Sequence, residues 1–445
     1  MTEKPLTHAL AAFAHGIHRD EISAKALHAA RRSMLDFCGV ALAGSRHPGT
    51  LALRRTLDRG APGTSILIGM GQTCDPFTAA QINGFAAHVF DWDDTILPAR
   101  AHFGATLLPA IFAESAHHDW SLGEALTALA AGFEISARLS TALYPAIHDN
   151  RWHTTAVIGP VGVAAALGRL LGADVPQIAH GMGLAANGAG GLMSSFGTSA
   201  KALNVGRAAS WGLLSAHLGR DMKTHDETLD AGGFIRCFAD GSSVAGIADG
   251  LGRPWSIERN GFKPYPCGFV AHPAIDAVRD LRTAAGDRSV ERIMLEVAPV
   301  ALDLMGCQVP ATELEAKFSL SYVAAIAWIE GNVTPSAFED SAIASPAVRG
   351  LTGRLEVLST PSLGQEEARA EAVFTDGSRR SATVFAARGS SGRPLSDYDL
   401  AAKFRAAVRH SRIADVEGLA DTILSAEHDV PLSTVTRRLR GHDDC

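Results

Sequence analysis

The stretch HVFDWDDTILPARAH, residues 88–102, brings acids and imidazoles together. Its carboxylate and imidazole side chains belong to His88, Asp91, Asp93, Asp94 and His102. Imidazole and carboxylate groups at this spacing suit proton transfer or the binding of a polar substrate. Converging carboxylates would instead suit a divalent cation, and an acidic helix end in solvent is a third interpretation.

A helical conformation over residues 84–95 would separate these acids. His88, Asp91 and Thr95 would then lie on one face, because positions i, i+3 and i+7 share a face. Asp93 would point away from that face. Carboxylates held apart in this way favour proton transfer over metal binding, so no metal is predicted.

Two later segments carry isolated polar side chains. NRWHTTAVIGP, residues 150–160, places His153 just before a small-residue helix, and FGTSAKALNVG, residues 196–206, places Lys201 far along the chain from any acid. Burying an unpartnered ammonium is costly and lowers its pKa. Alternatively, Lys201 buries only its stem and its ammonium reaches solvent.

The segment FKPYPCGFVAHPAIDAV, residues 262–278, contains Lys263, Cys267 and His272 at the expected domain boundary. Crevices between domains are preferred ligand sites. The glycine-rich segment over residues 183–197 lacks both the glycine spacing and the preceding strand of a dinucleotide-binding loop. No nucleotide cofactor is therefore expected.

Secondary-structure elements must position these residues. Before about residue 240, the spacing of apolar residues predicts helices. Apolar residues recur with a helical period over residues 21–44. Residues 121–143 open with Ser121 and Glu124, the spacing of a capping box. The abundance of alanine and glycine predicts closely packed helices.

The pattern changes after about residue 265, where alternating segments predict strands. These strands are expected at residues 290–299 and 352–359, and as a hairpin over 368–387 around Asp376-Gly377. Helices are expected at residues 319–331 and 395–408. The predicted fold is mainly α, with a large all-helical domain plus a smaller α+β domain. The helical domain would be discontinuous, comprising residues 1–265 and 396–445, and the α+β domain would comprise residues 266–395.

The overall composition limits the function classes. At 445 residues the chain is too long for one compact core. Its 47 acidic and 40 basic residues give a net charge of -7, which argues against an electrostatic nucleic-acid binder. The six cysteines form no C-x-x-C pair, and neither a signal peptide nor a membrane span is apparent. We expect a cytoplasmic protein with reduced thiols and no membrane partner.

Seven segments between residues 83 and 331 together resemble the MmgE/PrpD family. They are NGFAAHVFDWDDT, HFGATLLPAIFAESA, GFEISARLS, RWHTTAVIGPVGVAAALGRLLG, GLAANGAGGLMSSFGTSAKALNVGRAA, GFKPYPCGFVAHPAIDA and LEAKFSLSYVAAIAWIEG. The resemblance implies a helical large domain, a smaller α+β domain, and a homodimer with its active site between domains. Phe103 and Asn204 depart from the family pattern, in which proline and histidine are frequent at these positions.

The resemblance also implies site residues. Together with the spacing argument, it assigns catalysis to Asp91, His102, His153, Lys201 and Tyr322, and substrate binding to His88, Thr95, Lys263 and His272. Family members include 2-methylcitrate dehydratase, cis-aconitate decarboxylase and iminodisuccinate epimerase. These reactions add or remove a proton at carbon next to a carboxylate, and they need preorganised cations rather than a cofactor.

The leading hypothesis is a cofactor-independent enzyme acting on a small di- or tricarboxylate. Within it, an epimerase of the iminodisuccinate type is favoured, because the departures at Phe103 and Asn204 point away from the dehydratase. 2-Methylcitrate dehydratase and cis-aconitate decarboxylase are the alternatives. A magnesium-dependent helical lyase using the three aspartates and a non-catalytic helical scaffold are the hypotheses from other classes.

Overall fold

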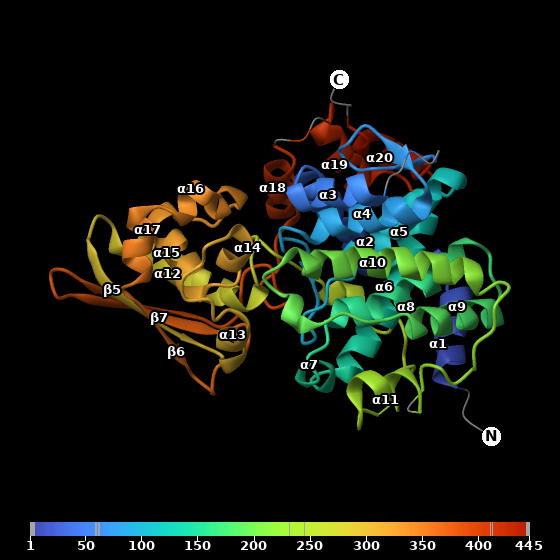
Figure 1. The fold of residues 1–445 in the computed structure, drawn as a ribbon, viewed down its shortest axis with the longest axis horizontal. Coiled ribbons are helices and arrows are strands. Elements are labelled where there is room, and N and C mark those ends of the chain that lie inside the picture. The colour runs from blue at the N-terminus through green and yellow to red at the C-terminus, as the bar shows by residue number, and fades with distance from the viewer. Residues whose placement is uncertain are drawn as a thin grey trace.

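The computed structural model describes residues 5–57, 60, 63–230, 232–243, 245–409, 411 and 413–441. Figure 1 shows a large helical body beside a smaller one that contains a sheet. This mainly helical architecture with a smaller α+β part confirms the predicted fold class.

The large body is built from helices that lie before residue 240. They are α1 (Leu6–Gly16), α2 (Ala24–Gly44), α3 (Pro48–Leu57), α4 (Pro76–His88), α5 (Gly104–Glu114), α6 (Leu122–Leu143), α7 (Ala146–Asp149), α8 (Thr154–Leu170), α9 (Val175–Asn187), α10 (Ser199–Leu218) and α11 (Phe234–Ala239). The predicted capping box of Ser121 and Glu124 starts α6, and Ser23 caps α2.

Small residues allow helices α4 and α10 to approach closely. A Cβ atom added to Gly206 of α10 would lie only 2.2 Å from the backbone oxygen of Gln81 on α4. Glycine is therefore required where these two helices cross. Their contact places the start of α10, which carries Lys201, beside the turn that follows α4.

The smaller body is centred on a four-stranded sheet with strand order β6-β5-β7-β8. Its strands are β5 (Val290–Val297), β6 (Leu355–Ser359), β7 (Ala368–Phe374) and β8 (Arg379–Val384). Strands β5 and β6 are parallel, whereas the other neighbours are antiparallel. The predicted strands and hairpin are confirmed, and Gly377 adopts a positive φ of 81° in the hairpin turn.

Helices cover the sheet and complete the core of the smaller body. They are α12 (His272–Ala285), α13 (Pro299–Leu304), α14 (Glu313–Ala316), α15 (Leu320–Glu330), α16 (Asp340–Ile343) and α17 (Pro346–Thr352). Helix α12 packs on β7 and β8, and α15 packs on α12. Alternate residues of β7 are buried, so one face of the sheet contributes to an apolar core formed by residues 265–384.

The last helices return to the large body. They are α18 (Asp397–Ala407), α19 (Val416–Ser425) and α20 (Ser433–Thr436). Helices α18 and α19 pack on α2, and the Arg31 guanidinium of α2 donates to the backbone oxygen of Ile423, 2.8 Å away. We propose to assign residues 396–441 to the helical domain. Residues 442–445 of the predicted segment lie outside the described residues.

Short strands add two further connections. Strand β1 (Ser65–Ile66) pairs with β2 (Thr73–Cys74), and β3 (Asp94–Thr95) pairs with β4 (Gly261–Phe262). The second pair joins segments far apart in sequence, with Asp94 opposite Phe262. It therefore places Lys263 beside the turn that precedes β3.

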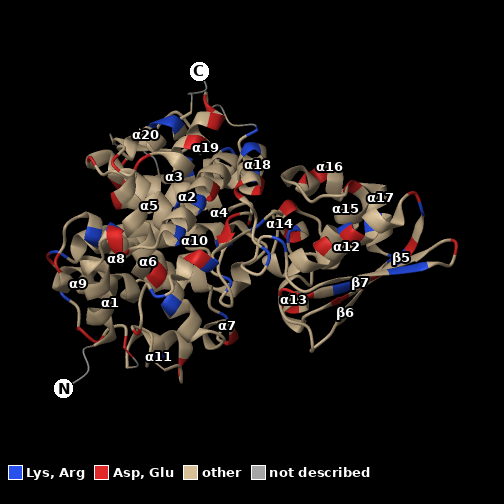
Figure 2. Cartoon of the chain, turned by 180° about the vertical axis from the view of Figure 1, so that it is seen from behind, with Lys and Arg blue, Asp and Glu red and all other residues tan. Residues whose placement is uncertain are grey.

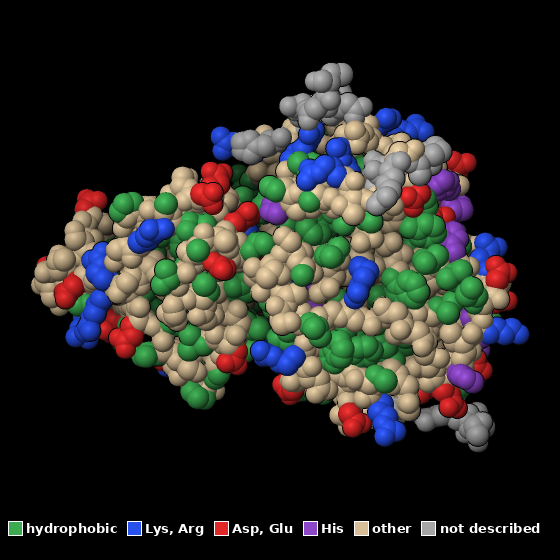
Figure 3. All heavy atoms as spheres, in the orientation of Figure 1, with side chains coloured by type: hydrophobic (Ala, Val, Ile, Leu, Met, Phe, Trp, Pro, Cys, Tyr) green, Lys and Arg blue, Asp and Glu red, His purple; other side chains and the backbone are tan. Residues whose placement is uncertain are grey.

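Charged residues are distributed over both bodies, as Figure 2 shows. On the face drawn in Figure 3, acidic and basic side chains are interspersed rather than gathered by sign. Among the described helices, none has the length and apolar character needed to span a membrane. The cysteines of the described chain form no disulfide with one another.

Candidate active site

The aspartate segment adopts a buried turn. The prediction of a helix over residues 84–95 is wrong, because α4 ends at His88 and the chain then turns before β3. Asp91 has a φ of 52°, a left-handed conformation that aspartate adopts more readily than bulkier residues. Asp91, Asp93 and Asp94 are 4%, 2% and 2% exposed, so a solvated helix end is also wrong.

The carboxylate of Asp91 binds two lysines. Its Oδ1 lies 2.5 Å from Nζ of Lys201 and 2.8 Å from Nζ of Lys263. The Lys263 ammonium also donates to the backbone oxygen of Asp91, 3.2 Å away. Lys201 is only 7% exposed, so the interpretation that its ammonium reaches solvent is wrong. Its partner comes from a turn distant in sequence.

Burial and charge compete in this cluster. Burial alone would raise the pKa of Asp91, but the ammonium groups of Lys201 and Lys263 hold it well below its ordinary value. Burial lowers the pKa of Lys201, and the attraction of Asp91 only partly offsets this. For Lys263, attraction to Asp91 and Asp93 outweighs burial and raises the pKa. Lys201 is therefore the more acidic ammonium.

Two uncharged histidines accompany the lysines. Burial, with the nearby Lys263, holds the pKa of His102 well below its ordinary value, and burial with Lys201 does the same for His153. Nδ1 of His102 lies 2.6 Å from the backbone oxygen of Asp94, to which it donates. A neutral imidazole that donates from Nδ1 carries its lone pair on Nε2. Both ring nitrogens of His153 lack a hydrogen-bond partner within the described chain.

A further layer of polar groups lies behind these histidines. Nδ1 of His88 lies 2.7 Å from Oδ2 of Asp93. Burial opposes the ionisation of Asp93, but His88 and His102 hold its pKa below the ordinary value. Asp94 accepts hydrogen bonds from Asn260 and Gly104. Burial, together with the charge of Asp93, raises the pKa of Asp94 to about 8, so this carboxyl group is protonated at neutral pH.

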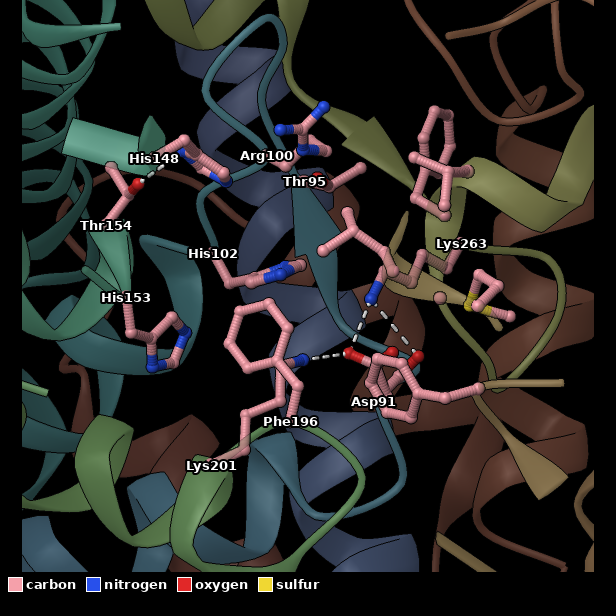
Figure 4. A pocket seen from close by; sticks show the side chains of 16 residues that line it. Asp91, Thr95, Arg100, His102, His148, His153, Thr154, Phe196, Lys201 and Lys263 are labelled. Carbon is pink, nitrogen blue, oxygen red and sulfur yellow. Dashed lines mark hydrogen bonds and ion pairs between the residues drawn. The ribbon is translucent and has the colours of Figure 1, made fainter. Parts of the chain in front are cut away.

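These groups line a pocket between the two bodies, and the space within its walls, open solvent included, is about 490 Å³. Its lining consists of Asp91, Thr95, Arg100, His102, His148, His153, Thr154, Phe196, Lys201, Lys263, Gly268, Phe269, Val270, Leu304, Met305 and Phe318. In Figure 4, Lys201 and Lys263 approach Asp91 at one end of the view, and Arg100, Thr95, His148 and Thr154 lie at the other. His102 and His153 lie between the two ends.

The structure brings six of the nine predicted site residues to this cavity. They are Asp91, Thr95, His102, His153, Lys201 and Lys263. His88 lies behind the lining, with its ring centroid 4.9 Å from that of His102. His272 is buried against Tyr265 and Phe269. The Tyr322 hydroxyl donates to the backbone oxygen of Ala337, 2.5 Å away.

Three of the predicted site residues lie outside this lining, and their roles stay predictions. His88 and His272, predicted to bind substrate, and Tyr322, predicted to be catalytic, do not line the cavity. The side chains of His272 and Tyr322 belong to the packed interior of the smaller body. Nδ1 of His88 is bound to Asp93, and its buried Nε2 has no hydrogen-bond partner within the described chain.

The sequence reasoning missed several lining residues. Arg100 lies within the segment already singled out, between Thr95 and His102, and its charge was the available signal. His148 lies shortly before His153 in the sequence. The apolar wall had no local signal, because Phe196 and Phe318 meet only in the folded chain, where their rings lie 5.3 and 5.7 Å from Nζ of Lys201.

The donor atoms favour an anion over a metal ion. Ligand atoms of His88, Asp91 and His102 lie within 4.8 Å of one another, the only such group among the described residues. However, Oδ1 of Asp91 already binds two ammonium groups, which would repel a divalent cation. Asp93 and Asp94 have separate partners, so the three aspartates do not form the site of the magnesium hypothesis.

Comparison with known proteins agrees with this architecture. Residues 8–245 match the model of the MmgE/PrpD N-terminal domain, and residues 265–424 match that of the C-terminal domain. The cis-aconitate decarboxylases of Mus musculus and Homo sapiens are each 27% identical to this chain over 99% of its length, covering 94% and 96% of their own lengths. A cis-aconitate decarboxylase of Aspergillus terreus is 25% identical over 92% of this chain and 91% of its own length.

Proposed function

Because the chain belongs to the MmgE/PrpD family, we propose that it is a cofactor-independent lyase that decarboxylates cis-aconitate or a closely similar small polycarboxylate. The relatives reported above are named cis-aconitate decarboxylases, which favours this reaction over the epimerisation expected from the sequence. Epimerisation and dehydration are retained as outcomes of the test below. A cytoplasmic location and a homodimer remain predictions.

The observation that carries this proposal is the pair of ammonium groups on one buried carboxylate. Within the pocket lining, two ammonium groups face one carboxylate, because the other negative charge that attracts Lys263, that of Asp93, lies behind the lining. A substrate carboxylate in the pocket can therefore bind to these ammonium groups. Because Asp91, Lys201 and Lys263 are buried, this attraction is stronger than it would be in solution.

The same charges suit the chemistry of decarboxylation. Loss of CO2 breaks a carbon–carbon bond and leaves its electron pair on the substrate, where a neighbouring unsaturated carboxylate can accept it. Positive groups held in place stabilise this developing negative charge. A proton then replaces the lost carboxylate, giving an unsaturated dicarboxylate one carbon shorter.

The proton can come from within the cavity. Lys201 combines a lowered pKa with a place beside Asp91, which makes it the favoured acid. The lone pair on Nε2 of His102 makes this histidine the favoured proton acceptor if the substrate must first lose a proton. Asp91 would position both lysines without exchanging a proton, because its pKa is well below neutral.

Turnover in D2O tests the reaction. The purified protein is incubated separately with cis-aconitate, 2-methylcitrate and iminodisuccinate, and the products are followed by NMR. We expect CO2 release from cis-aconitate, with one deuterium incorporated into the product. Loss of water from 2-methylcitrate, or inversion of iminodisuccinate, without decarboxylation of cis-aconitate would overturn the assignment.

Two controls separate the other classes. Activity that survives exhaustive EDTA treatment excludes the magnesium-dependent lyase. A Lys201→Met variant must lose turnover, whereas the same change at the exposed Lys223 must not. If wild type, Lys201→Met and Lys223→Met all fail to turn over every substrate, the result would support the non-catalytic scaffold instead.

A further inference from the structure

Arg100 is a third cationic side chain of the pocket lining, at the end away from the lysine pair (Figure 4). Its Nη1 donates to Oε1 of Gln365, 2.7 Å away, in the loop between β6 and β7. Its guanidinium carbon lies 5.5 Å from the centre of the Tyr144 ring. Within the described chain, its buried Nε has no hydrogen-bond partner.

A buried guanidinium N–H without a partner is costly, and a bound anion would remove this cost. The described lining contains one carboxylate, Asp91, and that group already binds Lys201 and Lys263. The charge of Arg100 is therefore not compensated by an acid within the lining. Guanidinium groups bind carboxylates strongly because they offer charge and directed donors together.

Two other polar side chains at this end of the pocket, those of Thr95 and His148, can also donate a hydrogen bond to a bound carboxylate. The buried hydroxyl of Thr95 has no hydrogen-bond partner within the described chain. Oγ1 of Thr154 lies 3.2 Å from Nδ1 of His148. When Thr154 donates this bond, the neutral imidazole of His148 carries its proton on Nε2 and can donate to a ligand. Burial and the charge of Arg100 lower the pKa of His148 to about 3, which keeps this ring neutral.

We propose that Arg100, assisted by Thr95 and His148, binds the substrate carboxylate that does not react, and that this subsite selects acids with carboxylates at both ends. This inference rests on the proposed function, because it assigns the carboxylate that accepts the electron pair to the lysine end. His102 and His153 then face the carbon atoms between the two anchored groups. Monocarboxylates would lose one of the two anchors.

Binding measurements test this subsite without requiring turnover. Glutarate carries two carboxylates, whereas its monoamide glutaramate has nearly the same shape and only one. Calorimetry with wild-type protein and Arg100→Met is expected to show glutarate binding weakened about 30-fold in the variant. Glutaramate, bound through its single carboxylate at the lysine end, should weaken less than about threefold.

The bond between Arg100 and Gln365 provides a matched control. Gln365→Ala removes this link between the two bodies but keeps the guanidinium, so both ligands should bind within about threefold of wild type. If Gln365→Ala weakens glutarate as much as Arg100→Met does, Arg100 has a structural role and the proposal fails. It also fails if Arg100→Met weakens both ligands equally.

Two further variants protect the test against misfolding. Arg100→Gln, which can still bond to Gln365, should show the same selective loss of glutarate binding if Arg100→Met does not fold. Arg100→Lys should recover part of the affinity for glutarate. Absence of turnover with every polycarboxylate would reject the proposed reaction, whereas selective glutarate binding through Arg100 would still support the subsite.

Discussion

A buried aspartate meets buried lysine at two places in the large body, and the two places differ in the number of ammonium groups. Asp36 of α2 binds one, that of Lys403 on α18, with Oδ1 and Nζ 2.5 Å apart. Asp91 binds two, those of Lys201 and Lys263. The first cluster is a one-to-one ion pair, whereas in the second two ammonium groups share one carboxylate and Asp93 adds a further negative charge near Lys263.

The carboxyl groups respond in opposite directions. Burial raises the pKa of Asp36 to about 6, because the single ammonium of Lys403 only partly offsets the cost of desolvation. Burial acts on Asp91 too, but two ammonium groups outweigh it and hold the pKa well below the ordinary value. The pKa is thus raised where one lysine faces the buried carboxyl group, and lowered where two lysines, together with His88 and His102, surround it.

The surroundings of the two clusters suggest different purposes. Lys403 donates to Asp36 and to the backbone oxygen of Trp92, so it ties α18 to α2 and to the turn that carries Asp91. It does not line the candidate active-site cavity, whereas Lys201 and Lys263 do. We therefore expect the Asp36–Lys403 pair to support the fold, and the cluster of Asp91, Lys201 and Lys263 to support activity.

The largest expected effect comes from Lys201→Met, which makes the Asp91 cluster resemble the Asp36 cluster. Removing the proposed acid and one of the two ammonium groups together should reduce kcat/KM by about 10³-fold or more, because positioned charge and proton transfer each contribute strongly. Steady-state kinetics with cis-aconitate measures this. The folded state should persist, because Lys263 still pairs with Asp91.

The carboxyl group provides a second readout for the same variant. With one ammonium left, the pKa of Asp91 should move upward, towards the behaviour of Asp36, which carbon NMR of the labelled side chain can follow. Activity within tenfold of wild type would contradict the role assigned to Lys201. Lys223→Met is the matched control and should leave both readouts unchanged.

Lys403→Met should show the opposite pattern. Removing one partner of a buried ion pair leaves an unpaired carboxyl group, so the free energy of unfolding should fall by about 3 kcal/mol. Urea denaturation measures this loss, and activity at a temperature where the variant is folded should fall less than tenfold. Adding Asp36→Asn should restore part of the stability. A Lys403→Met protein that is as stable as wild type but has strongly reduced activity would contradict the structural role assigned to Lys403.

Asp94 extends the comparison to a buried aspartate without an ammonium partner in the described chain, and its pKa is raised to about 8. This folded-state pKa exceeds that of the unfolded chain, so its contribution to stability is complete below about pH 4 and is lost as the pH rises through about 8. Asn at this position cannot ionise but can still accept from Asn260 and Gly104.

Asp94→Asn should therefore gain roughly 2 kcal/mol of stability relative to wild type when the pH is raised from 6 to 8. Denaturation at the two pH values measures the difference between the proteins. A difference that does not change with pH would show that Asp94 is already ionised at pH 6. Asp93→Asn is a useful contrast, because the pKa of Asp93 is lowered, so this group has no comparable loss of stability across that range.

The smallest expected effect concerns the pH profile. Burial lowers the pKa of Lys201, so activity that needs its ammonium should decline at alkaline pH earlier than an ordinary lysine would allow. Lys201→Arg keeps a positive charge to higher pH. The alkaline limb of kcat/KM should therefore move up by about one pH unit or more, even if kcat falls. If the alkaline limb of kcat/KM does not move in Lys201→Arg, the ionisation that causes this limb belongs to another group.

Local patterns in the sequence were sufficient for much of the fold. The capping box of Ser121 and the Asp376-Gly377 hairpin each depend on residues close together in the chain, and both are present. The helical conformation considered for residues 84–95 is wrong beyond His88, because contacts between residues far apart in the chain determine the conformation there. The left-handed conformation of Asp91 is held by lysines 110 and 172 positions away, which local periodicity does not detect.

The candidate site could be predicted from the sequence only in part, because its contacts join residues that are far apart in the chain. Lys201 was noticed because it lacked a local partner, and its partner proved to be Asp91. His272 and Tyr322 were named from the family resemblance, but their side chains are packed within the smaller body. Arg100 was overlooked because its significance depends on Gln365 and on an unpartnered Nε, both of which exist only in the folded chain.

The return of α18 to α2 also has a consequence for how the protein is made. On α2, Asp36 and the surface at Gly39, which Phe404 covers in the finished fold, belong to a helix synthesised early. At ordinary rates of translation, roughly twenty to seventy seconds pass between the synthesis of α2 and that of α18. During that interval Asp36 lacks the ammonium of Lys403 and the surface at Gly39 lacks the ring of Phe404, so the contacts that close this side of the helical domain can form only at the end of synthesis.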